Sequence, residues 1–414
     1  MNPKHIALRL LKESSPAFAI ADQLAMVGGN FILCIVIARL SSAEDFGRFS
    51  VLYALVVLVN ALHGPLVSEP ISLSRSGPAD NISSSKADRT TFIIFAPIAA
   101  MICLAANLLG YLESAIQTAA LFAACCCSAL YWSQKARLHA VSSHRTAFVV
   151  SAISSLVMLT SALAATLLTD RTSAGLLGIS IGALAGYVLG SLLDRHSAAV
   201  ALSFRKLLDS AKIGVPSALL IWLANNFLFF FLASSQRLED GAALRVITTL
   251  LLPINQVMIG FSLFLLPRIA HLKQQGQMRE AYALSIRTLI ASLGAALCIG
   301  LAALAASEAL LRVTFGPTFA SYSNLLGIAA CTLPSAWIAV TISRTYMRGS
   351  AMGLDLIKIY AIALFFGIPL SISLLQTTSR FGPVNALICI HMILATLFLT
   401  HLLRQRHRLN HAIT

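Results

Sequence analysis

The run PAFAIADQLAMVGGNFILCIVIARL, residues 16–40, decides the fold class of this chain. A helix needs about 20 mainly apolar residues to cross the hydrocarbon core of a bilayer, and this run is long enough. It carries the polar residues Asp22, Gln23 and Asn30 and lacks a convincing cleavage site, which argues against a signal peptide. We therefore expect a first membrane-spanning helix here.

Runs of this kind recur along all 414 residues, of which 57% are hydrophobic and only 11% are charged. An ordinary soluble domain has about 25% charged residues, so lipid must be the solvent for most of this chain. The twelve predicted spans are Pro16–Leu40, Phe49–Leu73, Thr91–Tyr111, Ser114–Ser133, Thr146–Thr169, Gly175–Leu193, Gly214–Ser234, Ala243–Leu266, Ala283–Ala305, Tyr322–Ser343, Leu354–Leu375 and Pro383–Leu403. The sequence thus predicts an all-α polytopic membrane protein with about twelve transmembrane helices.

The basic residues predict the orientation of these helices. If the N-terminus is cytoplasmic, 23 of the 30 lysines and arginines lie on the cytoplasmic side, Lys135 and Arg137 among them. The opposite side receives Arg39, Arg48, Arg171, Arg237, Arg245, Arg312 and Arg380. Because cytoplasmic loops carry an excess of lysine and arginine, we expect a protein of the bacterial inner membrane with both termini on the cytoplasmic side.

The chain also has the pattern of an internal repeat. The first helix of each half begins near a proline, Pro16 or Pro216, and is followed by an acidic turn, at residues 41–47 or 237–241. We expect two pseudo-symmetric six-helix lobes around a central cavity, related by an axis along the membrane normal. The predicted boundaries are residues 1–193 for the N-terminal lobe, 194–213 for a cytoplasmic linker and 214–414 for the C-terminal lobe.

Composition and motifs argue against several classes of function. The net charge of +14 sits between apolar runs, which fits lipid headgroups rather than nucleic acid. No nucleotide-binding G-x-x-x-x-G-K-[ST] loop or His/Cys/Glu cluster at metal spacing is present, so we expect no cofactor and no metal site. Short outer loops leave no room for a soluble catalytic domain, so we expect a transporter rather than an enzyme.

Polar residues within the spans are the candidate functional residues, because polar groups are costly in lipid. A lone carboxylate in the first span, Asp22, needs a partner, a proton or water. The other candidates are amides near the midplane, titratable residues of the second span and two arginines near the outer ends of spans 1 and 8: Asn30, Asn60, Asn225, Asn226, Asn255, Gln256, His63, Glu69, Arg39 and Arg245. The amides fall on spans 1, 2, 7 and 8, which we expect to line the cavity.

Each candidate also has a purely structural interpretation. The amides can bond a neighbouring helix, and Glu69 can pair with Arg75 at the interface. His63 can pack beside the Gly64–Pro65 pair, and Arg39 and Arg245 can be interfacial anchors. A glycine stripe on the sixth span, Gly175, Gly178, Gly182, Gly186 and Gly190, predicts close helix packing within the lobe.

Four stretches are similar to Wzx-type polysaccharide flippases of the multidrug/oligosaccharidyl-lipid/polysaccharide exporter superfamily. They are ARLSSAEDFGRF at residues 38–49, LLPRIA at 265–270, TFGPTF at 314–319 and RFGPVNA at 380–386. The resemblance implies alternating access, in which an undecaprenyl-diphosphate-linked oligosaccharide moves from the inner to the outer leaflet. It implies a polyprenyl-diphosphate-linked glycan and the lipid bilayer as partners, leaves room for other polysaccharide assembly proteins, and implies no nucleic acid.

Some relatives place basic residues in the cavity against the diphosphate, whereas this sequence predicts amides but no lysine or arginine at mid-membrane. Two alternatives to the flippase remain open. An ion-coupled small-molecule exporter of the same superfamily would use Asp22 for its coupling ion. A membrane polysaccharide polymerase or ligase would act on the same lipid carriers, but such enzymes usually need a long outer loop.

Overall fold

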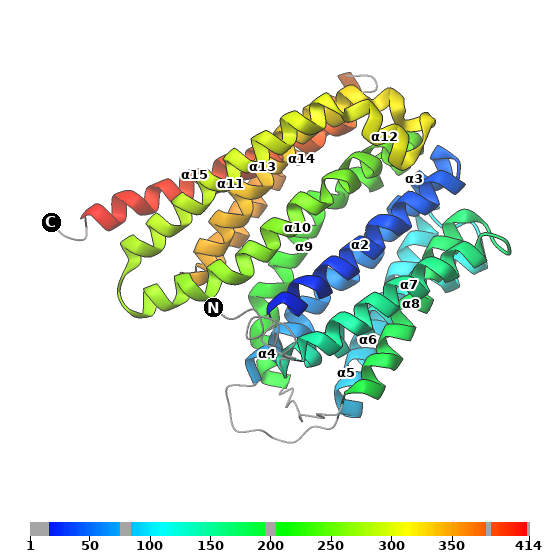
Figure 1. Cartoon of the computed structure of the whole chain (residues 1–414), viewed down its shortest axis with the longest axis horizontal. Helices are drawn as coiled ribbons and strands as arrows, with labels where there is room; N and C mark the ends of the chain where they lie inside the picture. The colour runs from blue at the N-terminus through cyan, green and yellow to red at the C-terminus, as the bar shows by residue number, and fades with distance from the viewer. Residues whose placement is uncertain are drawn as a thin grey trace, which may run out of the picture. The chain divides into compact units, whose positions relative to one another are not determined.

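The computed structural model describes residues 16–74, 84–141, 143–194, 204–350, 352–377 and 382–411. Within these ranges the chain is helical, and Figure 1 shows long helices joined by short connections. The helices of the first half are α2 (Pro16–Leu40), α3 (Ala43–His63), the π-helix η1 (Gly64–Ser68), α4 (Glu69–Ser74), α5 (Ser84–Leu108), α6 (Ala115–Ala140), α7 (His144–Ala165) and α8 (Arg171–Leu193).

The second half of the chain is equally helical. Its elements are α9 (Phe204–Ser234), α10 (Leu238–Gln274), α11 (Met278–Ala305), α12 (Ser307–Phe315), the 3₁₀-helix η2 (Pro317–Tyr322), α13 (Ser323–Gly349), α14 (Gly353–Thr377) and α15 (Gly382–His411). Helix α12 and η2 lie between the predicted spans Ala283–Ala305 and Tyr322–Ser343, so this connection is largely helical.

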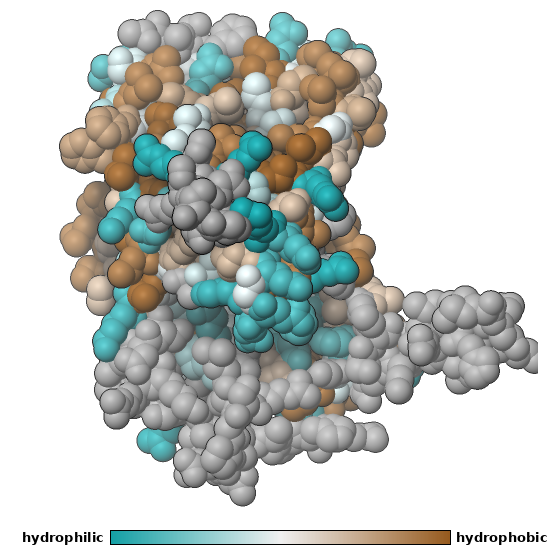
Figure 2. Space-filling view, turned by 90° about the vertical axis from the view of Figure 1, so that its left-hand side faces the viewer, coloured by the Kyte–Doolittle hydropathy of each residue, from teal (hydrophilic) through white to brown (hydrophobic). Residues whose placement is uncertain are grey.

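Twelve helices within the described ranges are long and apolar enough to cross a membrane, which confirms the predicted number. The surface agrees with this, since the large apolar side chains of Met101 and Phe365 are 69% and 74% exposed. Figure 2 shows one face of the molecule, on which brown hydrophobic residues cover broad areas between teal hydrophilic ones. Apolar side chains exposed in such numbers are suited to lipid rather than to water.

Several helices are longer than the apolar runs that predicted them. The fourth span was expected to end at Ser133, but α6 continues to Ala140, and the seventh begins at Phe204 instead of Gly214. The described part of the predicted linker is therefore helical from Phe204 onward. Hydropathy marks only the part of a helix that lies in hydrocarbon, so polar turns that extend a helix are missed by it.

The chain divides into two compact units. The first comprises Met1–Trp222 with Phe229–Ala242, and the second comprises Leu223–Leu228 with Ala243–Thr414. In the first unit, α2 packs on α7, α8 packs on α6 and α7, and α5 packs on α6. In the second, α13 packs on α11 and α15, and α14 packs on α15.

The glycine stripe of the sixth span packs against its neighbours in the first unit, as predicted. A Cβ atom on Gly182 of α8 would lie 2.8 Å from the Met158 Cα and the Ser154 carbonyl oxygen of α7. Gly186 and Gly190 similarly face Tyr131 and Gln134 of α6. The missing side chains let α8 approach α6 and α7 closely, which is the usual role of small residues between membrane helices.

The two predicted acidic turns are both helix N-termini. Ser42 caps α3 by accepting a hydrogen bond from the Asp45 amide, and Arg237 donates to Asp240 in the first turn of α10. Acidic residues at these positions also interact favourably with the helix dipole. Gly47 lies directly against the backbone of Leu238, so the two turns touch each other within the first unit.

Candidate functional site

The Asp22 carboxylate lies at the centre of a polar cluster in the first unit. The side chain is fully buried, about two turns into α2. Its Oδ1 is 2.9 Å from the Lys135 ammonium of α6, and its Oδ2 is 2.9 Å from Nε2 of His139. The Ser151 hydroxyl of α7 also donates to Oδ1. Side chains of α6 and α7 thus bond one carboxylate of α2, so Asp22 has the partners that a buried charge requires.

Lys135 is the most important residue that the sequence interpretation misplaced. We predicted it in a cytoplasmic connection, but it lies inside α6 and is only 1% exposed. Its ammonium contacts the Met26 sulfur at 3.6 Å and lies 5.4 Å from the centroid of the Trp132 ring. A buried cation is stable only when paired, so Lys135 and Asp22 depend on each other.

His139 links the buried Asp22 carboxylate to a less buried part of the first unit. Its side chain is 31% exposed, whereas that of Asp22 is completely covered. Its other ring nitrogen, Nδ1, lies 3.2 Å from Nδ1 of His144 at the start of α7. Imidazole can both accept and donate a proton, so the Asp22–His139–His144 chain has the geometry of a proton path.

A small cavity of about 70 Å³ lies next to this cluster. Two predicted residues, Asn30 and Asn60, line it together with Tyr53, Tyr131 and Trp132. Asn30 donates to the Met26 carbonyl oxygen, while the buried Oδ1 of Asn60 has no partner among the described residues. The cavity is partly polar and large enough for water.

A second ion pair holds the same end of α6. Arg137 is 5% exposed and contacts both carboxylate oxygens of Asp88 in α5, to which the Tyr187 hydroxyl of α8 also donates at 3.0 Å. The Arg137 guanidinium also donates to the side-chain oxygen of Gln134. This network fixes α5, α6 and α8 around the Asp22 cluster.

His63 and Glu69 lie on either side of the π-helix η1. The His63 ring is buried, stacks on Phe95 at 5.4 Å and pairs with the Ser68 hydroxyl at 3.0 Å. Its Nε2 has no partner among the described residues. Glu69 begins α4 and is partly buried. Arg75, its suggested partner, lies outside the described residues.

The candidates of spans 7 and 8 belong to the second unit. There, Asn225 lies 3.3 Å from Nε2 of His391, a buried residue of α15 that the sequence interpretation missed and that packs against the edge of Trp337. Asn226 and Arg245 are buried, and Asn255 and Gln256 are partly buried. Arg39, at the end of α2 in the first unit, is exposed. The cavity predicted for spans 1, 2, 7 and 8 remains a prediction.

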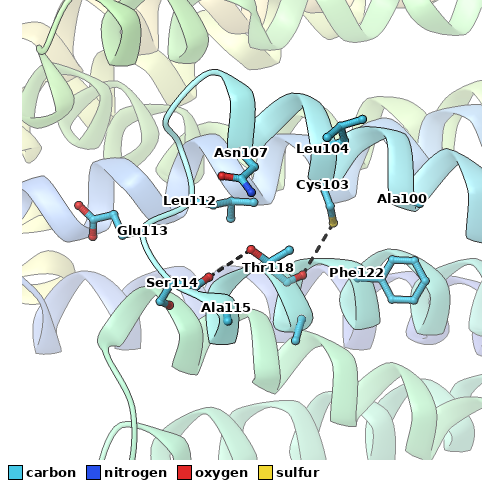
Figure 3. A pocket seen from close by; sticks show the side chains of 11 residues that line it. Ala100, Cys103, Leu104, Asn107, Leu112, Glu113, Ser114, Ala115, Thr118 and Phe122 are labelled. Carbon is cyan, nitrogen blue, oxygen red and sulfur yellow. Dashed lines mark hydrogen bonds between the residues drawn. The ribbon is translucent and has the colours of Figure 1, made fainter.

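A larger cavity next to α5 and α6 has no part in these clusters. It measures about 810 Å³, and Figure 3 shows it between Cys103 and Leu104 of α5 and Thr118 and Phe122 of α6. The one charged residue in its lining, Glu113, is paired with Arg48. Its lining is mainly apolar and includes none of the predicted site residues, so it fits lipid chains better than a polar substrate.

The part of the chain that the structure describes contains no group of three or more His, Cys, Asp or Glu residues that could hold a metal ion. The Asp22 cluster has one carboxylate surrounded by nitrogen and hydroxyl donors. Such an arrangement can exchange a proton or a salt-bridge partner.

No protein-family model matches the chain. A search of curated proteins found no match either. Solved structures do match over nearly the whole length. They include a mutant of the Vibrio cholerae MATE transporter VcmN, 14% identical over 98% of both chains with a TM-score of 0.67.

A MOP superfamily transporter from Pyrococcus furiosus is 14% identical, with 99% and 96% of the two chains covered and a TM-score of 0.69. An outward-facing multidrug resistance MATE family transporter is 13% identical over 99% of both chains, with a TM-score of 0.64. The chain therefore has the fold of MOP superfamily transporters.

Proposed function

We propose that the protein is a transporter that flips an undecaprenyl-diphosphate-linked oligosaccharide from the cytoplasmic to the outer leaflet of a bacterial inner membrane. It would act in cell-surface polysaccharide biosynthesis, by alternating access. The observation that carries transport is the buried Asp22–Lys135 ion pair inside a chain with the fold of MOP superfamily transporters. The substrate class rests on the four short stretches that are similar to polysaccharide flippases.

The ion pair supports a transport role because charges in membrane helices are costly to keep. Two opposite charges inside a protein gain little net stability over apolar residues of the same size. Their presence is better explained by a working cycle in which Asp22 exchanges Lys135 for a proton or another cation. His139 would then deliver that proton, since it contacts Asp22 and is partly exposed.

The deciding experiment removes the gene from its native host and measures surface polysaccharide and lipid-linked intermediates. We expect polysaccharide to fall and intermediates to accumulate on the cytoplasmic side. Reintroducing the wild-type gene should restore export, and the Asp22→Asn variant should not, although its protein reaches the membrane. Normal polysaccharide in the deletion strain would exclude the flippase.

An ion-coupled small-molecule exporter is the second candidate, and the same Asp22–His139 contact favours it. The deletion strain distinguishes the two, because an exporter would leave polysaccharide normal and make the cells sensitive to toxic cations. The proposed topology has its own test. Reporters fused at Lys86 and Thr318 should report the cytoplasm and the periplasm, respectively.

A further inference from the structure

The second unit contains an apolar groove with a single cation. It has a volume of about 660 Å³ and is lined by α10, α11 and one residue of α13. The only charged residue in its lining is Arg287 of α11, beside Thr288. Arg287 is exposed and has no ion pair or hydrogen bond with any described residue. None of the predicted site residues lines this groove.

The floor of the groove follows one face of α11. Ala291, Ala295 and Ile299 lie beyond Arg287 at helical spacing, and Val257 of α10 forms part of the opposite wall. At 1.5 Å per residue, the distance along α11 from Arg287 to Ile299 is about 18 Å. That is close to half of the hydrocarbon thickness of about 30 Å. The groove thus suits a chain that enters from one headgroup layer and ends near the bilayer centre.

We propose that this groove holds the lipid end of the substrate, with the diphosphate at Arg287 and the prenyl chain along the alanine face. This inference rests on the proposed function and adds a second binding site to it, outside the Asp22 cluster. An arginine is always charged and bonds phosphate oxygens in a fixed geometry, whereas the rest of the lining is mainly apolar apart from Thr288 and Ser292. The combination matches an amphiphile with an anionic head.

The proposed function selects the prenyl lipid as the occupant, because a prenyl diphosphate joins one anionic head to one hydrocarbon chain. The groove volume of about 660 Å³ lies within the size range of small-molecule pockets and accommodates the part of the chain next to the head. A glycerophospholipid instead carries two chains. In the predicted orientation Arg287 lies near the cytoplasmic end of its span, so the site would receive substrate from the leaflet where it is made.

The test measures binding of undecaprenyl diphosphate to the purified full-length protein by native mass spectrometry. Undecaprenol and phosphatidylglycerol are the comparison ligands, the first lacking the phosphates and the second carrying two chains. We expect Arg287→Leu to weaken undecaprenyl diphosphate binding about tenfold, as for loss of a hydrogen bond to a charged group. Ala295→Phe should weaken it by filling the exposed floor, and undecaprenol should bind less tightly than the diphosphate.

Lys358→Leu is the matched control, since Lys358 is an exposed cation of the same unit outside the groove. It should leave binding unchanged. Wild-type affinity in both Arg287→Leu and Ala295→Phe would overturn the inference, as would equal binding of phosphatidylglycerol. Suppose that the wild type binds undecaprenyl diphosphate and that deletion of the gene blocks polysaccharide export. Either overturning outcome then refutes only the assignment of the groove and leaves the proposed function in place. No binding together with normal polysaccharide refutes the proposed function itself.

Discussion

The Asp22 carboxylate of α2 lies 2.9 Å from the Lys135 ammonium of α6, and both side chains are buried. Neither residue is stable in this place without the other, because an unpaired charge inside a protein costs several kcal/mol. The pair therefore ties the first span to the fourth.

Separate and joint replacement of this pair distinguishes stability from transport. Lys135→Met alone should lower the free energy of unfolding by about 3–5 kcal/mol, because it leaves the buried Asp22 carboxylate without the Lys135 ammonium and with only His139 and Ser151 as partners. The combination of Asp22→Leu with Lys135→Met should recover most of that loss, yet export should stay abolished. Thermal unfolding in detergent and polysaccharide export measure the two effects. Recovery of export in the joint variant would show that the pair is structural.

His139 should affect how export depends on pH. It contacts Asp22 through Nε2 while its side chain stays 31% exposed. We expect His139→Gln to slow export and to change how its rate depends on pH, because glutamine cannot exchange a proton with Asp22 as imidazole can. His401→Gln, in α15 of the second unit, is the control. An unchanged profile in reconstituted vesicles would remove His139 from the proton path.

Gly182 and Gly294 should respond in opposite ways to the same substitution. A Cβ atom on Gly182 would lie 2.8 Å from backbone atoms of α7, whereas one on Gly294 of α11 would meet nothing within 4 Å. Gly182→Ala should therefore destabilise the protein by about 1–3 kcal/mol through overpacking. Gly294→Ala should be neutral or stabilising by up to about 1 kcal/mol, because alanine favours the helix. Thermal unfolding of the two purified variants provides the comparison.

Asp170 should stabilise α8 in a pH-dependent way. It is the N-cap, accepting from the Ser173 amide at 2.8 Å. Burial alone would raise the pKa of Asp170, but hydrogen bonds from Ser173 and Gln117 outweigh it and hold the pKa below its ordinary value. A lowered pKa means that the carboxylate stabilises the fold above the unfolded pKa of about 3.9 and loses this effect as the pH falls through the folded pKa.

Asp170→Ala should accordingly cost about 0.5–2 kcal/mol at pH 7, as for other caps, and less in acid. Asp170→Asn keeps the acceptor and should cost little at pH 7. Melting temperatures of the three proteins at pH 7 and in acid would test the assignment. An equal loss of stability in Asp170→Ala and Asp170→Asn would mean that the charge of Asp170, rather than its capping geometry, stabilises α8.

The sequence predicted the number of spans and the position of the first one, α2, because apolar runs report directly on lipid exposure. It also identified Asp22, since a carboxylate in such a run is conspicuous. The partner was missed because Lys135 follows the apolar part of α6, where hydropathy falls. A signal was present, since Tyr131, Lys135 and His139 recur every four residues and share one helix face.

His391 was missed for a different reason. One histidine within an apolar run has no distinguishing pattern, and its contact with Asn225 joins residues far apart in the chain. Contacts of that kind are set by how helices pack, which periodicity does not specify. The same holds for the groove lined by Arg287, which is one of the 23 basic residues that we counted on the cytoplasmic side.

The Asp22–Lys135 pair also bears on how the protein is made. Each charged residue opposes insertion of its own helix by about 2.5–3.5 kcal/mol at the centre of a span, and less toward the ends. Helix α2 is synthesised first, so its carboxylate has to wait, protonated or hydrated, until α6 emerges with the ammonium. Correct integration of two non-adjacent segments is therefore a joint event, completed only when the growing chain brings them together.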